Sequence, residues 1–500
     1  MSRVTLSLDE FRAIAAAHHR VIPVAQRVLA EDLTPTGVYR RLGGGPGSFI
    51  LESAEHGSWD RWSFVGIRSR ATLLSMDGTA QWLGDVPAGL PREGEILDVM
   101  RETLRILATP TLPDHPPLTG GMVGALGWDF VRSWESLPAT ARDDLGHPRV
   151  ALCLVDDMIV IDHSTGEVWL IANAINADGS DDRVDDAYAD CLARIEAMRS
   201  GLVEPAGTVL SGIEPNLAAE MTATMTQDRY EDAVRTAKGA IRDGEVFQVV
   251  FSMRFDVPTD ADPLDVYRAL RHVNPSPYMY LVKLPRPDGG TWDVVGSSPE
   301  TLVRVTDGGA MTFPIAGSRP RGSTPQEDVD LASELAADEK ERAEHLMLVD
   351  LSRNDMAKIC EPATVVVSEF MDIKRYSHIM HLCSTVTGRL RPDTGAVDAL
   401  VATFPAGTLS GAPKVRAMEL IDMVEPTRRG IYGGTVGYID FAGNMDMAIA
   451  IRTAVMADGR ATVQAGAGLV ADSVPTTEYI EVRNKAAAAA GAVARAGHVQ

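Results

Sequence analysis

The sequence has little of what marks a secreted, membrane-spanning or nucleic-acid-binding protein. Its 500 residues include only four cysteines (Cys153, Cys191, Cys360 and Cys383), none in a CxxC pair, so neither a disulfide framework nor a zinc site is expected. No apolar run approaches the roughly 18 residues of a membrane span. The formal net charge of −22 disfavours nucleic acid and anionic membranes as partners, because like charges repel.

What remains is typical of a large enzyme. Hydrophobic residues make up 45% of the chain, which is enough for a sizeable core in two or three domains. The first twenty residues carry acids and histidines where a signal peptide needs an apolar stretch, so we expect a cytoplasmic protein.

Periodicity predicts the fold class. Helical and strand-like segments alternate, and many neighbouring strands are joined by short turns, as in the hairpin predicted over 150–174 around HSTGE. Residues 7–31 are predicted to be one helix. We therefore expect an α+β fold with mixed, largely antiparallel sheets and surrounding helices. The predicted domains are 1–200 and 226–490, with a linker at 201–225 and a tail at 491–500.

An acidic motif on a predicted helix is the main candidate for chemistry. Glu341, Glu344 and His345 are spaced i, i+3, i+4, which places them on one helix face. Another face is expected to pack into the core through Ala343, Leu346, Met347 and Leu351. A solvated helix start whose acids complement the macrodipole is the simpler interpretation of such a motif.

A second acidic pair favours a metal site. Glu478 and Glu481 repeat the i, i+3 spacing near the C-terminus. Two such pairs from distant segments can converge on one hard cation, and oxygen-only ligation favours Mg²⁺ over zinc.

A glycine motif at 465–471, AGAGLVA, fits the dinucleotide fingerprint, but no helix follows it directly and Pro475 intervenes. We reject a nicotinamide site. Gly466 and Gly468 still let backbone N–H groups approach an anion closely.

Ordered blocks along nearly the whole chain carry a resemblance to a known family. They include GEVFQVVFSMRF (244–255), NPSPYM (274–279), GSSPETLVR (296–304), PIAGSRPRG (314–322), DEKERAEHLMLVDLSRND (338–355), FPAGTLSGAPK (404–414) and AGAGLVADSVPTTEYIEVRNKA (465–486). The chain closely resembles the chorismate-utilising enzymes, and within them the component I branch of anthranilate synthases. The resemblance implies Mg²⁺-dependent conversion of chorismate and ammonia to anthranilate and pyruvate through aminodeoxyisochorismate, the first committed step of tryptophan biosynthesis.

The resemblance also implies roles for individual residues. Glu344 and Glu481 would be metal ligands, with Glu478 close by, and Glu341 would be the general acid that protonates the departing C4 hydroxyl. Tyr432 and Arg452 would hold the enolpyruvyl carboxylate, and Lys485 would balance a negative charge in the pocket. The backbone would complete the pocket at Gly317, Ser318, Gly466, Ala467 and Gly468.

Two further residues are implied in the second half-reaction. His381 would serve pyruvate elimination, which needs a titratable group in reach of the ring, and Thr408 would contact the same region. Taken alone, a histidine in HIMHLCST is more often a hydrogen-bonded core residue.

The nucleophile is predicted from two positions. Relatives that attack chorismate with a lysine carry it where this chain has Ala316. Relatives that activate water carry a lysine base where this chain has Gln248, and glutamine cannot deprotonate water. Both favour ammonia. No cysteine lies in an amidotransferase elbow, so a glutaminase subunit (component II) is expected as partner in a hetero-oligomer.

A regulatory site is implied as well. The family's tryptophan inhibition site resembles LES (51–53) and NPSPYM, and would be lined by Ser53, Pro277, Tyr278, Met279, Val436 and Tyr438. A strand end at Ser53 and a rigid turn at NPSPYM are the simpler interpretations. Two other functions stay open, an aminodeoxyisochorismate synthase of secondary metabolism and a non-catalytic tryptophan-sensing subunit.

Overall fold

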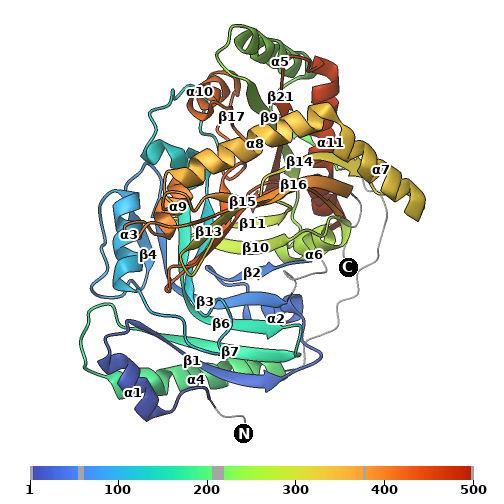
Figure 1. Cartoon of the computed structure of the whole chain (residues 1–500). Coiled ribbons are helices and arrows are strands. Elements are labelled where there is room, and N and C mark those ends of the chain that lie inside the picture. Colours follow the sequence, from blue (N-terminus) through green and yellow to red (C-terminus); the bar gives the residue numbers. More distant parts are fainter. Residues whose placement is uncertain (1–3, 55–60, 205–218, 376–378, 497–500) are drawn as a thin grey trace.

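A computed structural model describes residues 4–54, 61–204, 219–375 and 379–496 (Figure 1). The helices are α1 (Leu8–Ala16), α2 (Pro35–Leu42), α3 (Ile96–Ile106), the short 3₁₀ helix η1 (Trp128–Ser133), α4 (Val184–Val203), α5 (Gln227–Arg242), α6 (Pro263–Val273), α7 (Pro325–Ala337), α8 (Glu339–Ala357), α9 (Ala396–Thr403), α10 (Lys414–Val424) and α11 (Pro475–Ala496).

The strands are β1 (Val21–Leu29), β2 (Phe49–Glu52), β3 (Trp62–Ser75), β4 (Gln81–Gly84), β5 (Gly121–Leu126), β6 (Val150–Asp162), β7 (Glu167–Ile175), β8 (Thr222–Ala223), β9 (Gln248–Pro258), β10 (Tyr278–Pro285), β11 (Thr291–Ser298), β12 (Thr301–Thr306), β13 (Gly309–Thr312), β14 (Ile315–Pro320), β15 (Val366–Arg375), β16 (Ile379–Arg389), β17 (Gly411–Ala412), β18 (Thr435–Asp440), β19 (Met445–Ile449), β20 (Thr453–Ala457) and β21 (Arg460–Leu469).

The predicted fold class is confirmed. The pairings among these strands form one connected network, and each pair is antiparallel, as in β6–β7, β9–β21 and β15–β16. Helices lie on the outside, with α1 and α4 at one end of the molecule and α5, α8, α10 and α11 at the other (Figure 1). Antiparallel pairing follows from the short turns, because parallel strands need a crossover of a dozen or more residues.

The two halves of the chain share this network. Strand β2 pairs with β10 (Leu51↔Tyr280) and β5 pairs with β18 (Gly124↔Gly437), so core strands cross the predicted boundary. The division at 201–225 therefore stays a prediction. Helix α4 extends to Val203, β8 pairs with β9, and 205–218 lie outside the described residues.

The end of the chain differs from the expected tail. Helix α11 continues to Ala496, and its residues Ala492, Val493 and Ala496 are buried. The last four residues lie outside the described part of the chain.

The predicted 7–31 helix is wrong. Ser7 and Glu10 form a capping box that starts α1, but the helix ends at Ala16. The run Val21–Ile22–Pro23–Val24 is β-branched and contains a proline, so it favours a strand over a helix interior. It forms β1, which pairs with β7 along its full length.

The predicted core face of the acidic helix is wrong at two of its four positions, Ala343 and Leu346, whereas Met347 and Leu351 are half-buried. Leu346 is 53% exposed and Ala343 is exposed. The buried side chains of α8 are His345, Leu348, Val349, Asp355 and Met356. The His345 side of the helix packs on the sheet, where the His345 Nε2 lies 2.6 Å from the Ser384 hydroxyl on β16. Within the described residues, we find no helix both long and apolar enough to cross a bilayer.

Candidate active site

Helix α8 lies across β14 and β16 near α11, and this crossing brings the predicted site together (Figure 1). Its N-cap is Asp338, whose side chain accepts from the backbone N–H groups of Lys340 and Glu341. The cap fixes the first turn, so Glu341 and Glu344 leave the helix toward the strands rather than toward solvent alone.

Gln248, the first residue of β9, contacts Glu344 directly. Its Nε2 donates to Glu344 Oε1 at 3.2 Å, and Gln248 itself is 5% exposed. A Cβ at Gly468 on the neighbouring β21 would stand 2.5 Å from Gln248 Nε2. Gly468 is therefore needed to admit this amide, and the predicted positions 248, 344 and 468 form one wall.

Glu341 and His381 meet through Gly317. His381 Nδ1 lies 3.0 Å from the Gly317 carbonyl, which only accepts, so Nδ1 carries the hydrogen and the neutral ring has its lone pair on Nε2. Gly317 adopts φ +67, and a Cβ there would lie 3.0 Å from Glu341 Oε2. Burial, followed by the positive charge of Arg452, lowers the pKa of His381, so the ring is a base rather than a permanent cation.

The carboxyl groups of this region repel one another. Burial, then the charges of Glu344 and Asp338, raise the pKa of Glu341. Burial raises the pKa of Glu478, which the charge of Glu481 also raises and a hydrogen bond with Ser473 lowers. The charge of Lys340 on α8 lowers the pKa of Glu478 on α11 as well, so the start of α8 lies within electrostatic range of α11.

Lys485 links the second acidic pair to the glycine strand. Its Nζ lies 2.7 Å from Glu481 Oε1 and donates to the Gly466 carbonyl at 3.2 Å. A Cβ at Gly466 would lie 2.8 Å from the Tyr432 hydroxyl, so this glycine is also needed. The strand contains Gly466, Ala467 and Gly468 and has no helix directly after it, in line with rejection of the dinucleotide site.

The donor set fits a hard divalent cation held in part by the protein. Within the described ranges no three His, Cys, Asp or Glu side chains are gathered as a ready-made metal cage. The glutamates of α8 and α11 offer oxygen donors and negative charge. Mg²⁺ is commonly bound through one or two carboxylates with water and substrate oxygens completing its shell. Glu344 and Glu481, with Glu478 beside them, suit that arrangement.

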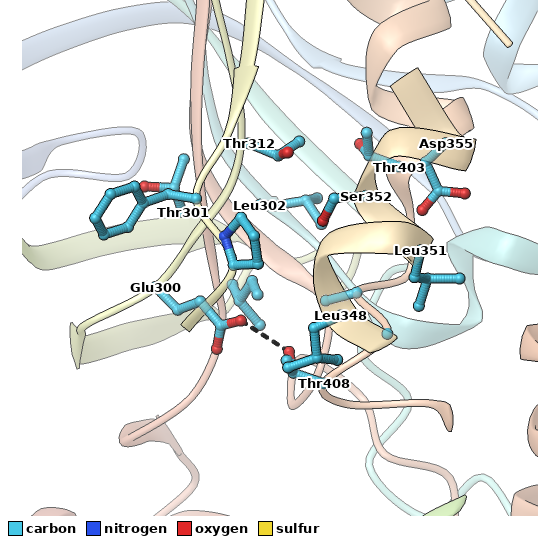
Figure 2. A pocket seen from close by; sticks show the side chains of 15 residues that line it. Glu300, Thr301, Leu302, Thr312, Leu348, Leu351, Ser352, Asp355, Thr403 and Thr408 are labelled. Atoms are coloured by element: carbon cyan, nitrogen blue, oxygen red, sulfur yellow. Dashed lines mark hydrogen bonds between the residues drawn. The ribbon is translucent and has the colours of Figure 1, made fainter. Parts of the chain in front are cut away.

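Glu300 is the residue that sequence reasoning missed. It follows β11 and precedes β12, and its Oε1 accepts a 2.9 Å hydrogen bond from the Thr408 hydroxyl (Figure 2). Burial raises the pKa of Glu300 to about 7, although Thr408, Arg452 and Lys485 all lower it. A small cavity of about 40 Å³ opens beside it, lined also by Leu348, Leu351 and Thr312. The available signal was a single acid in GSSPETLVR, between two apolar strands.

Arg452 and Tyr432 lie in the same region. Arg452 Nη1 donates to Asn274 Oδ1 at 3.4 Å, and its charge acts on both Glu300 and His381. Burial raises the pKa of Tyr432 well above its usual range, so its hydroxyl is a neutral hydrogen-bond donor. Ser318 pairs with His381 in the β14–β16 register, but it is exposed, so only its backbone is placed beside the site.

The predicted regulatory residues line a second cavity, of about 710 Å³. Ser53, Pro277, Tyr278, Met279, Val436 and Tyr438 all contribute to its wall. They come from the end of β2, the start of β10 and from β18, with Ser53 directly after β2 and Pro277 directly before β10. The cavity is largely aromatic and aliphatic, and one side carries the Arg304–Asp446 ion pair, to which the Tyr278 hydroxyl donates at 2.9 Å. Such a cavity suits a planar, zwitterionic ligand.

Comparison with known proteins places this site in a family. Residues 47–491 match the family described as chorismate binding enzyme, and the chain belongs to it. Among curated relatives it is 54% identical to anthranilate synthase component 1 of Arthrobacter globiformis over 499 residues, covering 99% of this chain and 94% of that one. It is 53% identical to the Mycobacterium tuberculosis H37Rv protein of the same name over 501 residues, covering 98% and 96%.

Solved structures agree with the fold. Anthranilate synthase component I of Streptococcus pneumoniae superposes with a TM-score of 0.75 at 34% identity, covering 93% of this chain and 99% of that one. The menaquinone-specific isochorismate synthase MenF of Escherichia coli gives a TM-score of 0.71 at 18% identity, covering 98% and 100%, which supports the fold alone.

Proposed function

We propose that this chain is component I of an anthranilate synthase, which converts chorismate and ammonia to anthranilate and pyruvate. The observation that carries the proposal is the convergence of Glu300, Glu344, His381 and Arg452 around one site. It occurs in a chain that matches proteins of that name over nearly its full length.

In the first half-reaction the nitrogen of ammonia bonds to C2, the ring double bonds shift and the C4–O bond breaks. The leaving hydroxyl needs a proton to depart as water. Glu300 suits this role better than the predicted Glu341, because burial holds the pKa of Glu300 at about 7 and keeps a proton available near neutrality. Gln248 and Ala316 supply neither a base for water nor a covalent nucleophile, which leaves ammonia as the attacking group.

In the second half-reaction the C2 proton leaves, the enolpyruvyl ether bond breaks and the ring becomes aromatic. The methylene carbon of the departing enolpyruvyl group takes up a proton, which gives pyruvate. The lone pair of His381 Nε2 is the proposed acceptor of the C2 proton. The Gly317 carbonyl holds the ring orientation through Nδ1–H, so the basic nitrogen has a defined direction. Arg452 and Tyr432 would hold the enolpyruvyl carboxylate as a cation and a neutral donor.

Mg²⁺, when bound, would neutralise the ring carboxylate and position the ring. Glu344 and Glu481 are its proposed protein ligands, with Glu478 nearby. Lys485 bridges Glu481 and the Gly466 carbonyl, so it holds the metal-side helix α11 against the substrate-side strand β21.

The proposal extends to regulation and nitrogen supply. The 710 Å³ cavity is the proposed tryptophan site of a feedback-inhibited, cytoplasmic enzyme of tryptophan biosynthesis. A separate glutaminase subunit would provide ammonia, since none of the four cysteines lies in an amidotransferase elbow.

The test is an assay of the isolated chain with chorismate, MgCl₂ and ammonium chloride, followed by anthranilate fluorescence and a coupled pyruvate assay. We expect equal amounts of anthranilate and pyruvate, and no turnover after chelation with EDTA. Consumption of chorismate without fluorescence or pyruvate would instead support an aminodeoxyisochorismate synthase. Tryptophan binding without any chorismate turnover would support a sensing subunit.

A further inference from the structure

A buried arginine behind the candidate active site has no part in the chemistry proposed above. Arg429 follows α10, and its side chain is 1% exposed while that of its ion-pair partner Glu425 is 3% exposed. The Arg429 Nε donates to Glu425 Oε2 at 2.9 Å, and Nη2 donates to Oε1 at 2.7 Å. Well-packed apolar residues often stabilise such a position as well as a buried ion pair does. The pair is therefore better explained by the groups that it holds in place.

The remaining donors of Arg429 reach two segments of the site. Its Nη1 donates to the Leu409 carbonyl at 2.7 Å, and its Nη2 donates to the Val250 carbonyl at 2.7 Å. Leu409 directly follows Thr408, whose hydroxyl binds the buried acid (Figure 2). Val250 lies two residues after Gln248 on β9. Because the guanidinium is planar with fixed donor directions, it holds the Thr408 loop in a defined place relative to β9.

Two aromatic rings contact the same guanidinium. Its central carbon lies 4.2 Å from the centre of the Trp128 ring and 5.6 Å from the centre of the Tyr432 ring. A cation within about 6 Å of a ring centre is attracted to the ring face, and most strongly where water is excluded. Trp128 belongs to η1, and a Cβ at Gly433 would stand 2.9 Å from its ring. The Trp128 ring is therefore packed tightly against the segment that carries Tyr432.

Glu425 fixes the guanidinium to the sheet. Its Oε1 also accepts from the Ser252 N–H and from the Ser252 hydroxyl, each at 2.8 Å. Gln464 Nε2 donates to the same hydroxyl at 2.8 Å. Ser252 is on β9 and Gln464 is on β21. The guanidinium thus has a defined position relative to the two strands that carry Gln248 and Gly468.

We propose that Arg429 is a positioning residue, which holds Thr408 against the general acid and Tyr432 against the enolpyruvyl carboxylate. This proposal rests on the proposed function, since both residues belong to that site. Arg429 contacts neither chorismate nor ammonia and acts through the Leu409 carbonyl and the Tyr432 ring. Such a group matters for the rate because a displacement of about 1 Å in a reacting site can cost ~100-fold.

The main variant removes the charge pair as a whole. Arg429→Met alone would leave the Glu425 carboxylate buried without a cation, which strongly destabilises a fold. Arg429→Met combined with Glu425→Gln avoids this, because the amide oxygen still accepts from Ser252. The matched control is Arg194→Met combined with Asp157→Asn. Arg194 is 10% exposed, pairs with the buried Asp157, and lies on α4, at the other end of the molecule from α10 (Figure 1).

The first readout is kinetic. Chorismate amination is measured with ammonium chloride, together with KM for chorismate. We expect the Arg429 double variant to lose about tenfold or more in the amination rate, because Thr408 no longer has a fixed place beside the acid. KM should rise, because Tyr432 is no longer held against the substrate carboxylate. The Arg194 control should keep both values.

The second readout is the pH profile of the amination rate, taken at a constant concentration of unprotonated ammonia. Burial raises the pKa of Glu300, and the hydrogen bond from Thr408 lowers it, as do two nearby charges, those of Arg452 and Lys485. Tyr432 stays neutral in this range because burial raises its pKa. A Thr408 loop that has lost its arginine should weaken the hydrogen bond. The alkaline limb, on which the acid loses its proton, should then move to higher pH.

A second pair of variants leaves every charge in place. Trp128→Phe still offers a ring face to the guanidinium, so it should keep most of the rate and the original alkaline limb. Trp128→Leu removes the ring, so it should lower the rate and shift the limb in the same direction as the Arg429 double variant. If that double variant does not fold, Trp128→Leu decides the question.

A lowered melting temperature with unchanged rate, KM and pH profile, both in the Arg429 double variant and in Trp128→Leu, would overturn the proposal. That pattern would show a purely structural contribution, and it is the pattern expected of the Arg194 control. The unmodified chain tests the proposed function by itself. Absence of anthranilate there counts against that function, whereas normal turnover in the variants counts against the positioning residue alone.

Discussion

The carboxylate of Glu300 accepts a 2.9 Å hydrogen bond from the hydroxyl of Thr408, 108 positions away in the sequence (Figure 2). The bond and the nearby cations favour the ionised form, while burial disfavours it, and burial wins because the pKa of Glu300 rises to about 7. A carboxyl group whose pKa is near neutrality is thereby placed within electrostatic range of Arg452 and Lys485.

The first prediction assigns the general acid. Glu300→Gln should lower the rate of chorismate amination by at least ~100-fold, the usual contribution of a positioned proton donor. Glu341→Gln, the matched control from α8, should retain more activity. The measurement is single-turnover loss of chorismate with ammonium. A normal rate in Glu300→Gln and a dead Glu341→Gln would restore Glu341 as the acid.

The second prediction concerns stability and pH. The pKa of Glu300 is about 7 in the folded state, above its ordinary value of 4.5. Between pH 4.5 and pH 7 the folded protein therefore keeps the Glu300 proton, whereas the unfolded protein has released it. The free energy of unfolding should therefore fall across that window, by about 1.4 kcal/mol for each tenfold drop in proton concentration. Glu300→Gln removes this loss, so it should gain stability relative to the unmodified chain from about pH 5 to about pH 8. Urea unfolding checks this, and parallel pH profiles for the two proteins would contradict it.

The third prediction separates the half-reactions. His381→Met removes the proposed proton acceptor but keeps a side chain of similar volume. The variant should still aminate chorismate, and it should accumulate a non-aromatic amino intermediate with little anthranilate. Chromatography of the reaction mixture detects that intermediate. If chorismate consumption stops altogether, His381 acts in the first step or in the structure.

The fourth prediction concerns the metal. Glu481→Gln removes one charged oxygen ligand from a cation that prefers them, so Mg²⁺-dependent chorismate binding and turnover should be lost. Circular dichroism should show an intact fold, because the Glu481 side chain is 44% exposed and its ion pair is with Lys485, one turn along the same helix. Full activity at limiting Mg²⁺ would argue against convergence of the two acidic pairs.

The fifth prediction concerns feedback. Ser53→Phe places a large ring in the 710 Å³ cavity and should produce an enzyme that resists tryptophan but turns over chorismate normally. Ser53→Ala, which leaves the cavity open, is the control. Blocking the effector site removes the coupling free energy between the two sites. Calorimetric titration that shows tight tryptophan binding to Ser53→Phe would contradict the assignment.

Local sequence patterns predicted the secondary structure correctly where residues close together in the chain determine it. The 150–174 hairpin forms as predicted because apolar alternation and a tight turn specify both strands. The 7–31 helix failed because β1 gains its stability from pairing with β7, about 140 positions away, and no local propensity reports that partner. The prediction of the buried face of α8 failed for a related reason. The buried side includes His345, which contacts Ser384 on a strand that is distant in the sequence.

By itself the sequence determined the chemical groups: the two acidic pairs, His381, Arg452 and the residues that exclude lysine chemistry at Gln248 and Ala316. The tertiary structure decided the pKa values of these groups and which of them lie close together. A pKa depends on burial and on charges within a few ångströms, and these are set by packing rather than by order along the chain. That is why Glu300, an ordinary acid in the sequence, becomes the strongest candidate for the proton donor only when β11, β12 and the Thr408 loop close around it.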